Sequence, residues 1–288
     1  MEYLIHILIL ICIYGTLGLS LNLVVGETGI LSVTQAAFYG IGAYTTALLM
    51  LSAGMNFFIA ALLGMILTGT IAGILSLVLA RLEGDYYALA SFGFNVIVWS
   101  IMLNWQSVTQ GPLGIPGITR PELFGVALSQ NAAFLALAAL ALLVTYALST
   151  SIVQSSFGRV LHAIREDAEA TSVFGYRVEY YKIAIFVISA MLAAFAGSLF
   201  ATYITYIDPS SFILSESIFI LSIVILGGLG SSRGAVLGAA LLIVLPEALR
   251  FVGFPSDIAA QMRQAVYGAL LILLMLYRPQ GLLGTFKL

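Results

Sequence analysis

The sequence predicts an all-α bundle of membrane-spanning helices, and three observations carry this prediction. Hydrophobic residues make up 61% of the 288 residues and charged residues only 8%, whereas a soluble domain typically carries about 25% charged residues. Several apolar stretches reach the roughly 20 residues that a helix needs to cross a bilayer. They lack the alternation typical of strands, and only helices or closed barrels satisfy the backbone inside lipid. We therefore expect residues 1–288 to form a single polytopic transmembrane domain of about 8 to 10 helices.

Nine stretches are apolar enough to be candidate helices. In chain order they cover residues 3–25, 30–51, 57–80, 86–105, 132–148, 183–203, 213–226, 235–252 and 262–277. The first follows Met1 without the positive region of a cleaved signal peptide, so we expect it to be retained as a helix. The seventh and ninth are shorter than a comfortable crossing, and each is a candidate for a broken or partly re-entrant helix.

A run of charge interrupts the apolar sequence at residues 150–182. It begins with Gly158-Arg159, continues through residues 163–171, and closes with Arg177, Glu179 and Lys182. Long apolar stretches flank it on both sides, so it must lie outside the lipid with its ends at the bilayer surface. A membrane protein presents a docking surface in this way, and we predict a cytoplasmic coupling loop here.

The positions of Lys and Arg predict the orientation, because cytoplasmic loops near membrane spans are enriched in them. If the charged segment is cytoplasmic, nine crossings place the amino terminus outside and the carboxyl terminus inside. The outer side then carries Arg120, Arg250 and Arg263. The inner side carries the larger set, Arg81, Arg159, Arg165, Arg177, Lys182, Arg233, Arg278 and Lys287.

Two glycine patterns lie outside the apolar stretches. Residues 106–130 are rich in glycine and proline, and they would form either an ordered lid or a plain connector on the outer side. Gly26 and Gly29 follow the first stretch much as Gly227 and Gly230 follow the seventh. This spacing is typical of the parallel internal repeats of some transporters.

The groups that catalysis requires are nearly absent. Neither Lys182 nor Lys287 follows the glycines of a Walker A motif, so we expect no hydrolysis of ATP by this chain itself. His6 and His162 are the only histidines and Cys12 is the only cysteine, which excludes HExxH zinc sites, thiolate metal clusters and an internal disulfide. No GxSxG nucleophile elbow occurs. We predict neither an enzyme nor a bound metal or cofactor.

Charge gives little support for two other function classes. The formal net charge of −2, without blocks of like charge, argues against a nucleic-acid partner. Ion-coupled transport would need ionisable groups at mid-membrane, and we expect none there. Glu247 lies toward an outer helix end, three residues before Arg250, so a local ion pair is expected. Glu216 lies at the outer start of the seventh stretch, where it complements the helix dipole.

Motifs spread over the chain from Leu21 to Gly284 resemble those of one permease family. They are Gly29, Leu31-Ser32, Ala36-Ala37-Phe38, Gly40 and Gly42-Ala43-Tyr44, then Tyr86-Tyr87-Ala88-Leu89 and Phe92-Gly93-Phe94, then Gly111, Gly114-Ile115 and Gly117-Ile118, then Gly227-Gly228-Leu229-Gly230 and Gly234, and finally Arg278-Pro279-Gln280-Gly281-Leu282-Leu283-Gly284. In combination they resemble the permease subunits of branched-chain amino acid importers of the ATP-binding cassette (ABC) class.

The resemblance implies that the charged segment docks on a cytoplasmic ATPase subunit. Glu169-Ala170-Thr171 with Gly175 is similar to the EAA-and-Gly signature of ABC importer permeases, with Thr171 replacing the second alanine, and the Ile-x-Leu-Pro ending of many relatives is missing. A short helix here would project charge into a cleft of the partner and transmit its closure as a rigid-body movement. The coupling residues would be Gly158, Arg159, Ala163, Ile164, Arg165, Glu166, Asp167, Glu169, Ala170 and Gly175.

Two polar positions depart from the family's pattern. Gln35 stands where relatives often carry His, and Val96 stands where relatives often carry Glu. These departures bear on the substrate, because an amino acid needs partners for a carboxylate and an ammonium, whereas an amide such as urea needs only hydrogen bonds. Amides inside spans either bond across helices or line a route. We predict a translocation pathway formed by Asn22, Gln35 and Asn95.

The resemblance implies a multi-pass permease of a prokaryotic inner or plasma membrane that moves branched-chain or other neutral amino acids. Its partners besides the bilayer would be cytoplasmic ATP-binding subunits, a second homologous or identical permease, and an extracytoplasmic solute-binding protein. The alternatives are a permease for urea or short-chain amides and, from a different class, an ion-coupled secondary transporter.

Overall fold

The computed structural model describes residues 2–82, 84–123, 126–127, 130–250, 268–269, 272 and 280–284. Within them, six helices are long and apolar enough to cross a membrane, and two shorter apolar helices follow. The predicted all-α, multi-pass class is therefore confirmed. The predicted ninth stretch, residues 262–277, falls almost entirely outside the described residues.

The elements are as follows in chain order. The first crossing is α1 (Glu2–Leu21), continued by the π-helical turn η1 (Asn22–Gly26). After it come α2 (Gln35–Ala53), α3 (Phe57–Leu79), α4 (Asp85–Asn104), α5 (Gln106–Thr109), η2 (Gly111–Leu113), β1 (Ile115–Pro116), β2 (Glu122–Leu123), β3 (Val126–Ala127), α6 (Asn131–Gln154), α7 (Ser156–Glu166), α8 (Ala168–Val173), α9 (Val178–Ile204), β4 (Tyr206–Ile207), η3 (Pro209–Phe212), α10 (Leu214–Gly227) and α11 (Ser232–Arg250).

The predicted boundaries of α3 and α4 are correct to within a residue, but that of α2 is wrong. The second stretch was expected from residue 30, whereas α2 begins at Gln35. Gly29 adopts a φ of +71° and the chain leaves the helix there. The non-helical Val33 then bonds to α4, because its carbonyl accepts from Asn95 Nδ2 at 3.0 Å and its N–H donates to Ser91 Oγ at 3.2 Å.

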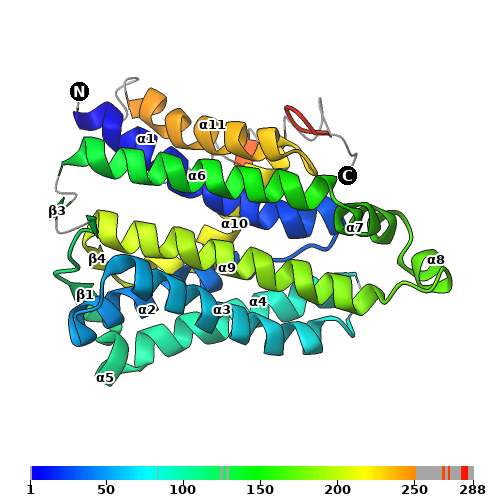
Figure 1. Ribbon diagram of the computed structural model, residues 1–288, viewed down its shortest axis with the longest axis horizontal. Coiled ribbons are helices and arrows are strands. Elements are labelled where there is room, and N and C mark those ends of the chain that lie inside the picture. The colour runs from blue at the N-terminus through cyan, green and yellow to red at the C-terminus, as the bar shows by residue number, and fades with distance from the viewer. Residues whose placement is uncertain are drawn as a thin grey trace.

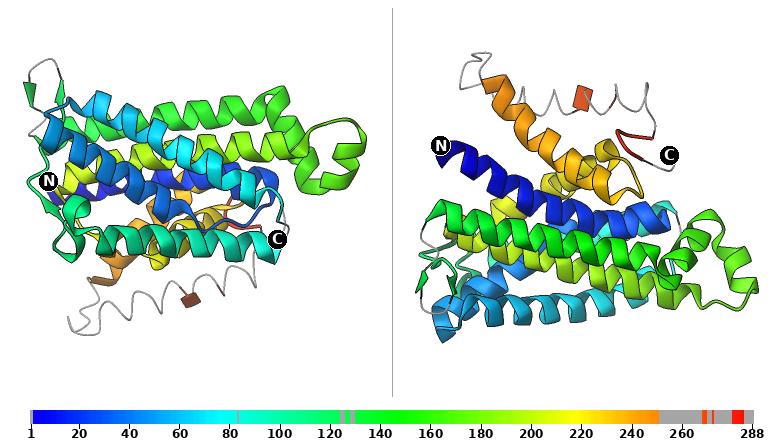
Figure 2. Two further views of the ribbon diagram at one scale, coloured as in Figure 1. Left: turned by 90° about the horizontal axis from the view of Figure 1, so that it is seen from below. Right: turned by 45° about the horizontal axis from the view of Figure 1, so that its top comes forward.

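The charged segment at residues 150–182 is mostly helical rather than an irregular loop. α6 continues to Gln154 and α9 begins at Val178, each extending about a turn or more past its apolar stretch. Between them lie α7 and α8, which we call the α7–α8 hairpin. Figures 1 and 2 show it projecting beyond one end of the bundle, here called the hairpin end.

The long helices lie side by side along the longest axis of the molecule (Figure 1). α9 is central: it packs against α2 and α3 on one side and against α1 on the other. α1 in turn packs against α6, α11 and α10. The main buried cluster is shared by α1, α2 and α9, with large aromatic side chains such as Phe38, Tyr39 and Phe212 at its centre.

Small residues bring α2 and α9 into direct backbone contact. A Cβ atom added at Gly197 would lie 2.0 Å from the carbonyl oxygen of Tyr39, and one added at Gly42 would lie 2.2 Å from the carbonyl oxygen of Ala194. Thr46 and Ser198 also share a hydrogen bond of 2.7 Å between their hydroxyl groups. Close approach through small residues and interhelical hydrogen bonds is how helices associate in lipid, where no hydrophobic effect drives them together.

Replacing Gly197 with leucine is expected to destabilise the folded protein more than any exposed substitution. The added side chain meets backbone atoms that cannot move aside, and overpacking of this kind costs about 1 to 3 kcal/mol. The thermal midpoint of the purified protein in detergent measures the effect. Gly93→Ala is the matched control, since a Cβ added at Gly93 meets nothing within 4 Å. Equal midpoints for the two variants would contradict the assigned contact.

The basic residues are distributed unevenly between the two ends of the bundle. Among the described residues, Arg81, Arg159, Arg165, Arg177, Lys182 and Arg233 belong to segments at the hairpin end, and Arg120 and Arg250 to segments at the opposite end. At that opposite end the segment after α4 is ordered. β1 pairs with β4, and the Tyr206 hydroxyl donates to the Leu113 carbonyl at 3.1 Å. Residues 106–118, in the first half of the predicted 106–130 segment, are therefore ordered against the chain after α9, and we call this end of the bundle the lid end.

The two glycine pairs noted in the sequence meet in space. Asn22 Oδ1 accepts from the Gly230 N–H at 3.0 Å, and a Cβ atom added at Gly26 would lie 2.7 Å from the Gly230 nitrogen. Gly29 and Gly230 adopt similar backbone angles, with φ of +71° and +73°. The end of α1 and the turn between α10 and α11 are thus in contact at the hairpin end.

Candidate functional site: the helical hairpin and the polar contacts inside the bundle

The corner between α6 and α7 admits only glycine at position 158. Ser155 caps α7, and its Oγ accepts from the Gly158 N–H at 3.3 Å. A Cβ atom added at Gly158 would lie 2.1 Å from the Val153 carbonyl oxygen. α7 can therefore begin only two residues after α6 ends because position 158 has no side chain to meet the last turn of α6.

α7 has one face toward the bundle and one toward solvent. Its buried side chains, Val160, Leu161 and Ile164, recur at helical spacing, and Leu161 shares a buried cluster with Leu23, Ile185 and Leu192. Arg159, Ala163 and Glu166 are exposed on the other face. Of the ten predicted coupling residues, Gly158 and Ile164 are therefore buried and Arg165 is half-buried. The other seven are exposed: Arg159, Ala163, Glu166, Asp167, Glu169, Ala170 and Gly175.

Polar contacts fasten α7 to the end of α1. His162 Nε2 pairs with Glu27 Oε2, and Arg165 Nη1 donates to the Gly26 carbonyl. Glu27 is fully buried. Burial raises the pKa of the Glu27 carboxyl, and the hydrogen bond with His162 and the charges of His162 and Arg165 act against that shift. α7 is therefore held by charge as well as by apolar packing.

Glu27 is a functional candidate that sequence reasoning missed. Its position offered a signal, because an acidic residue within a turn of an apolar stretch, flanked by Gly26 and Gly29, is costly to bury without a partner. The partner, His162, lies 135 residues further along the chain. No local pattern brings the two together, because the contact depends on how α7 folds back on the bundle.

α8 carries an exposed apolar tip. Asp167 caps it, since its Oδ1 accepts from the Ala170 N–H at 2.9 Å. Val173 and Phe174 follow at the far end and are 85% and 82% exposed. Gly175 then reverses the chain with a φ of +90°. Two large apolar side chains held this far into solvent, with carboxylates nearby, have the composition of a protein-binding surface.

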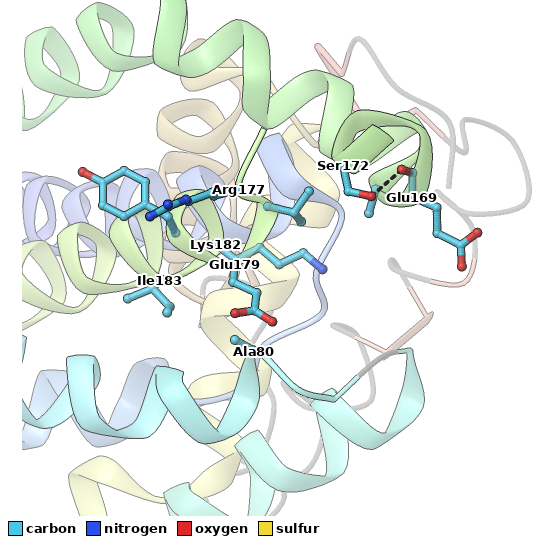
Figure 3. Close-up of a pocket in the computed structure, with 10 residues that line it drawn as sticks. Ala80, Glu169, Ser172, Arg177, Glu179, Lys182 and Ile183 are labelled. Atoms are coloured by element: carbon cyan, nitrogen blue, oxygen red, sulfur yellow. Dashed lines mark hydrogen bonds between the residues drawn. The ribbon is translucent and has the colours of Figure 1, made fainter. Parts of the chain in front are cut away.

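A charged groove lies between the α7–α8 hairpin and the body of the bundle. It has a volume of about 590 Å³, and charged residues from α8 and the start of α9 line it together with Ala80 at the end of α3. Figure 3 shows the Glu179 side chain beside Ala80 and Lys182 extending toward the side of α8, where Ser172 Oγ donates to the Glu169 carbonyl at 2.7 Å. The groove separates the hairpin from α3, so α8 lies apart from the bundle.

The three predicted pathway residues are all buried and bonded between elements. Asn22 bonds to the turn after α10, as described above. Gln35 Nε2 donates to Ser20 Oγ at 2.5 Å. Asn95 Nδ2 donates to Ser217 Oγ at 2.7 Å, and Ser217 Oγ also accepts from the Ala36 N–H at 2.9 Å. Gln35 and Asn95 therefore lie near the first turn of α10, and Asn22 lies near its other end.

α10 is a half-helix that begins inside the membrane region, so the expected position of Glu216 is wrong. After β4 at the lid end, the chain turns back into the bundle, and Phe212 packs edge-to-face on Tyr39 with ring centroids 5.2 Å apart. Glu216, in the first turn of α10, accepts from the Tyr14 hydroxyl at 2.6 Å. Tyr14 is the midpoint of the first span, Glu2–Gly26. Glu216 is thus a mid-membrane carboxylate. The seventh stretch is a broken crossing, one of the two forms expected for it, because it enters at the lid end and α10 ends at the hairpin end.

Glu247 is bonded to the first helix, and the side chain of Arg250, its predicted ion-pair partner, lies outside the part of the chain that the structure describes. Its Oε2 accepts from the Tyr3 hydroxyl, at the end of the bundle away from the α7–α8 hairpin. The described residues also contain no group of three or more His, Cys, Asp or Glu side chains that could hold a metal ion.

The bundle of apolar helices, with one half-helix and a charged helical hairpin at one end, defines a multi-pass membrane protein of the permease class. Residues 3–275 match the family described as "Branched-chain amino acid transport system / permease component". The chain belongs to this family, and its role is that of the permease in an ABC importer.

Curated relatives agree with this assignment. The chain is 37% identical to the high-affinity branched-chain amino acid transport system permease protein LivM of Escherichia coli K12, over 94% of this chain and 68% of that protein. It is 28% identical to the permease protein LivH of the same organism, over 94% of this chain and 91% of that protein. It is 36% identical to BraD of Pseudomonas aeruginosa over 49% of this chain and 44% of that protein. No solved structure matches the chain.

Proposed function

We propose that this chain is the membrane subunit of an importer that moves branched-chain or other neutral amino acids, driven by separate ATPase subunits that bind the α7–α8 hairpin. The observation that carries the proposal is the hairpin itself, exposed at its tip and fastened to α1 at its base. A second permease and an extracytoplasmic solute-binding protein complete the assembly. The whole of residues 1–288 acts as one transmembrane domain, with residues 150–182 as its coupling segment.

The contacts supply a route for movement. A partner bound to α8 and to the exposed face of α7 would move α7. Because His162 contacts Glu27 and Arg165 contacts the Gly26 carbonyl, the end of α1 would move with it. The end of α1 then moves against Gly230 through Asn22. The turn between α10 and α11 follows, and α10 carries the residues around Ser217. Rigid-body movement of one packed element past another is a common form of such a transition.

The basic residues at the hairpin end also support an orientation of the chain in the membrane. The excess of Arg and Lys there supports a cytoplasmic hairpin end, in a prokaryotic inner or plasma membrane. Glu2, at the opposite end, is then extracytoplasmic, and the lid of residues 106–118 faces the solute-binding protein.

Phe174→Asp is expected to lower the recovery of ATPase subunits with the purified permease roughly tenfold, because it places a charge in the apolar centre of the contact. Quantitative co-purification from membranes measures the effect. Leu113→Asp is the matched control: Leu113 is 81% exposed but lies at the lid end. Undiminished recovery with Phe174→Asp would rule out the hairpin as the docking site.

Measurements of labelled leucine uptake distinguish the proposed function from its alternatives. Competition of labelled leucine uptake by unlabelled urea or acetamide identifies an amide importer. Uptake that continues without ATPase subunits but collapses with the ion gradient identifies a secondary transporter, for which Glu216 would be the coupling residue. The proposal expects uptake that depends on ATP and is competed by neutral amino acids alone.

A further inference from the structure

Glu216 is an acidic residue in the middle of the membrane that the coupling route does not use. One carboxylate oxygen accepts a hydrogen bond from the Tyr14 hydroxyl, and the residue is half-buried. A carboxylate facing lipid at this depth costs several kcal/mol, so such residues face a water-filled route or a partner inside the bundle. The exposed part of Glu216 is therefore expected to meet a polar partner in the assembled transporter.

Its surroundings carry further polar groups. Asn95 and Ser217 bond to each other beside it, and Tyr39 packs against Phe212, four residues before Glu216. Among the described residues, Asn95 Oδ1 and the Tyr39 hydroxyl are buried without a hydrogen-bond partner. Two unpaired buried polar atoms next to a mid-membrane carboxylate indicate a place where a polar ligand binds.

We propose that Glu216 binds the ammonium group of the amino acid as it passes the middle of the membrane. This inference rests on the proposed function and adds a substrate-contacting residue to it. A neutral amino acid carries one ammonium and one carboxylate. Glu216 pairs with the ammonium, and the amino-terminal end of the half-helix α10 gives the carboxylate a favourable potential, as half-helix ends do at midplane substrate sites.

Two substitutions of Glu216 distinguish the effect of its negative charge from the effect of its size. Glu216→Gln keeps the size of the side chain and an oxygen that accepts from Tyr14, but it removes the charge. Glu216→Asp keeps the charge. In proteoliposomes that hold the full transporter and its saturated solute-binding protein, we expect Glu216→Gln to lower ATP-driven uptake roughly tenfold or more, and Glu216→Asp to retain most of it. Co-purification of the ATPase subunits with each variant shows that the complex is assembled. Glu247→Gln, a carboxylate at the lid end that also bonds to a tyrosine, is the matched control.

Labelling tests the position without relying on activity. Cys12 is the only cysteine, so Cys12→Ser gives a background for Glu216→Cys. We expect a membrane-impermeant cationic thiol reagent to label position 216 in one nucleotide state of the complex, and leucine to slow the labelling. The fully buried Phe134, replaced by cysteine, should stay unlabelled.

The outcomes are decisive in either direction. Normal uptake by Glu216→Gln, loss of uptake by Glu216→Asp in an assembled complex, or no labelling in any nucleotide state would overturn the inference while leaving the proposed function intact. A wild-type complex that imports no amino acid would instead refute the proposed function.

Discussion

Replacing Gly158 with valine is expected to reduce ATP-driven amino acid uptake roughly tenfold or more while the protein still inserts into the membrane. The valine Cβ would lie 2.1 Å from the Val153 carbonyl oxygen, so α7 cannot keep its angle to α6. The contacts of His162 and Arg165 with the end of α1 are then lost together. Coupling between sites is typically worth a factor of about 5 to 150, and this change removes the geometry on which it rests.

The measurement is uptake per ATP hydrolysed in proteoliposomes that contain the complete transporter. Gly93→Ala controls for the loss of a glycine, because position 93 has open space around it. The Gly158→Val protein should be recovered from membranes in normal amounts, since the apolar spans that direct insertion are unchanged. Wild-type coupling in this variant would show that the corner between α6 and α7 is not part of the transmission route.

Hydrophobic length predicted the full-length helices well and failed where a crossing is broken into an extended segment and a half-helix. α3 and α4 match their apolar stretches because such a stretch has no other stable conformation in lipid. Residues 213–226 are equally apolar, but their depth is set by Phe212 packing on Tyr39 and by Tyr14 bonding to Glu216. These are contacts between segments about 170 to 200 residues apart, and a window of sequence carries no information about them.

For the coupling segment, too, the sequence predicted the location but not the contacts of each residue. Its charge and its place between two apolar stretches identified it, because a run of charged side chains is too costly to place in lipid. The sequence could not tell which of its residues face outward. Ile164 is buried, and Arg165 donates to the Gly26 carbonyl at the end of α1. Arg159 and Glu166, on the same helix, are exposed to solvent.

Because Arg165 contacts the end of α1 and Arg159 faces solvent, we expect their substitutions to have different effects on transport. Arg165→Glu should reduce uptake roughly tenfold without releasing the ATPase subunits. It replaces a donor to the Gly26 carbonyl with a carboxylate next to the buried Glu27, and two like charges in a partly buried site repel strongly. Arg159→Glu changes the same residue type on the exposed face of the same helix. It should instead lower co-purification of the ATPase and leave the α1 contact untouched.

A second-site change tests the mechanism of the Arg165→Glu defect. Glu27→Gln removes the like charge while keeping an oxygen and an amide for His162, so the double variant should recover part of the lost uptake. Non-additivity of this kind is the sign of a direct interaction. Should Arg165→Glu and Arg159→Glu show the same loss of ATPase binding, or should Glu27→Gln give no recovery, then Arg165 belongs to the docking surface. The link from α7 to the end of α1 would then not carry the movement.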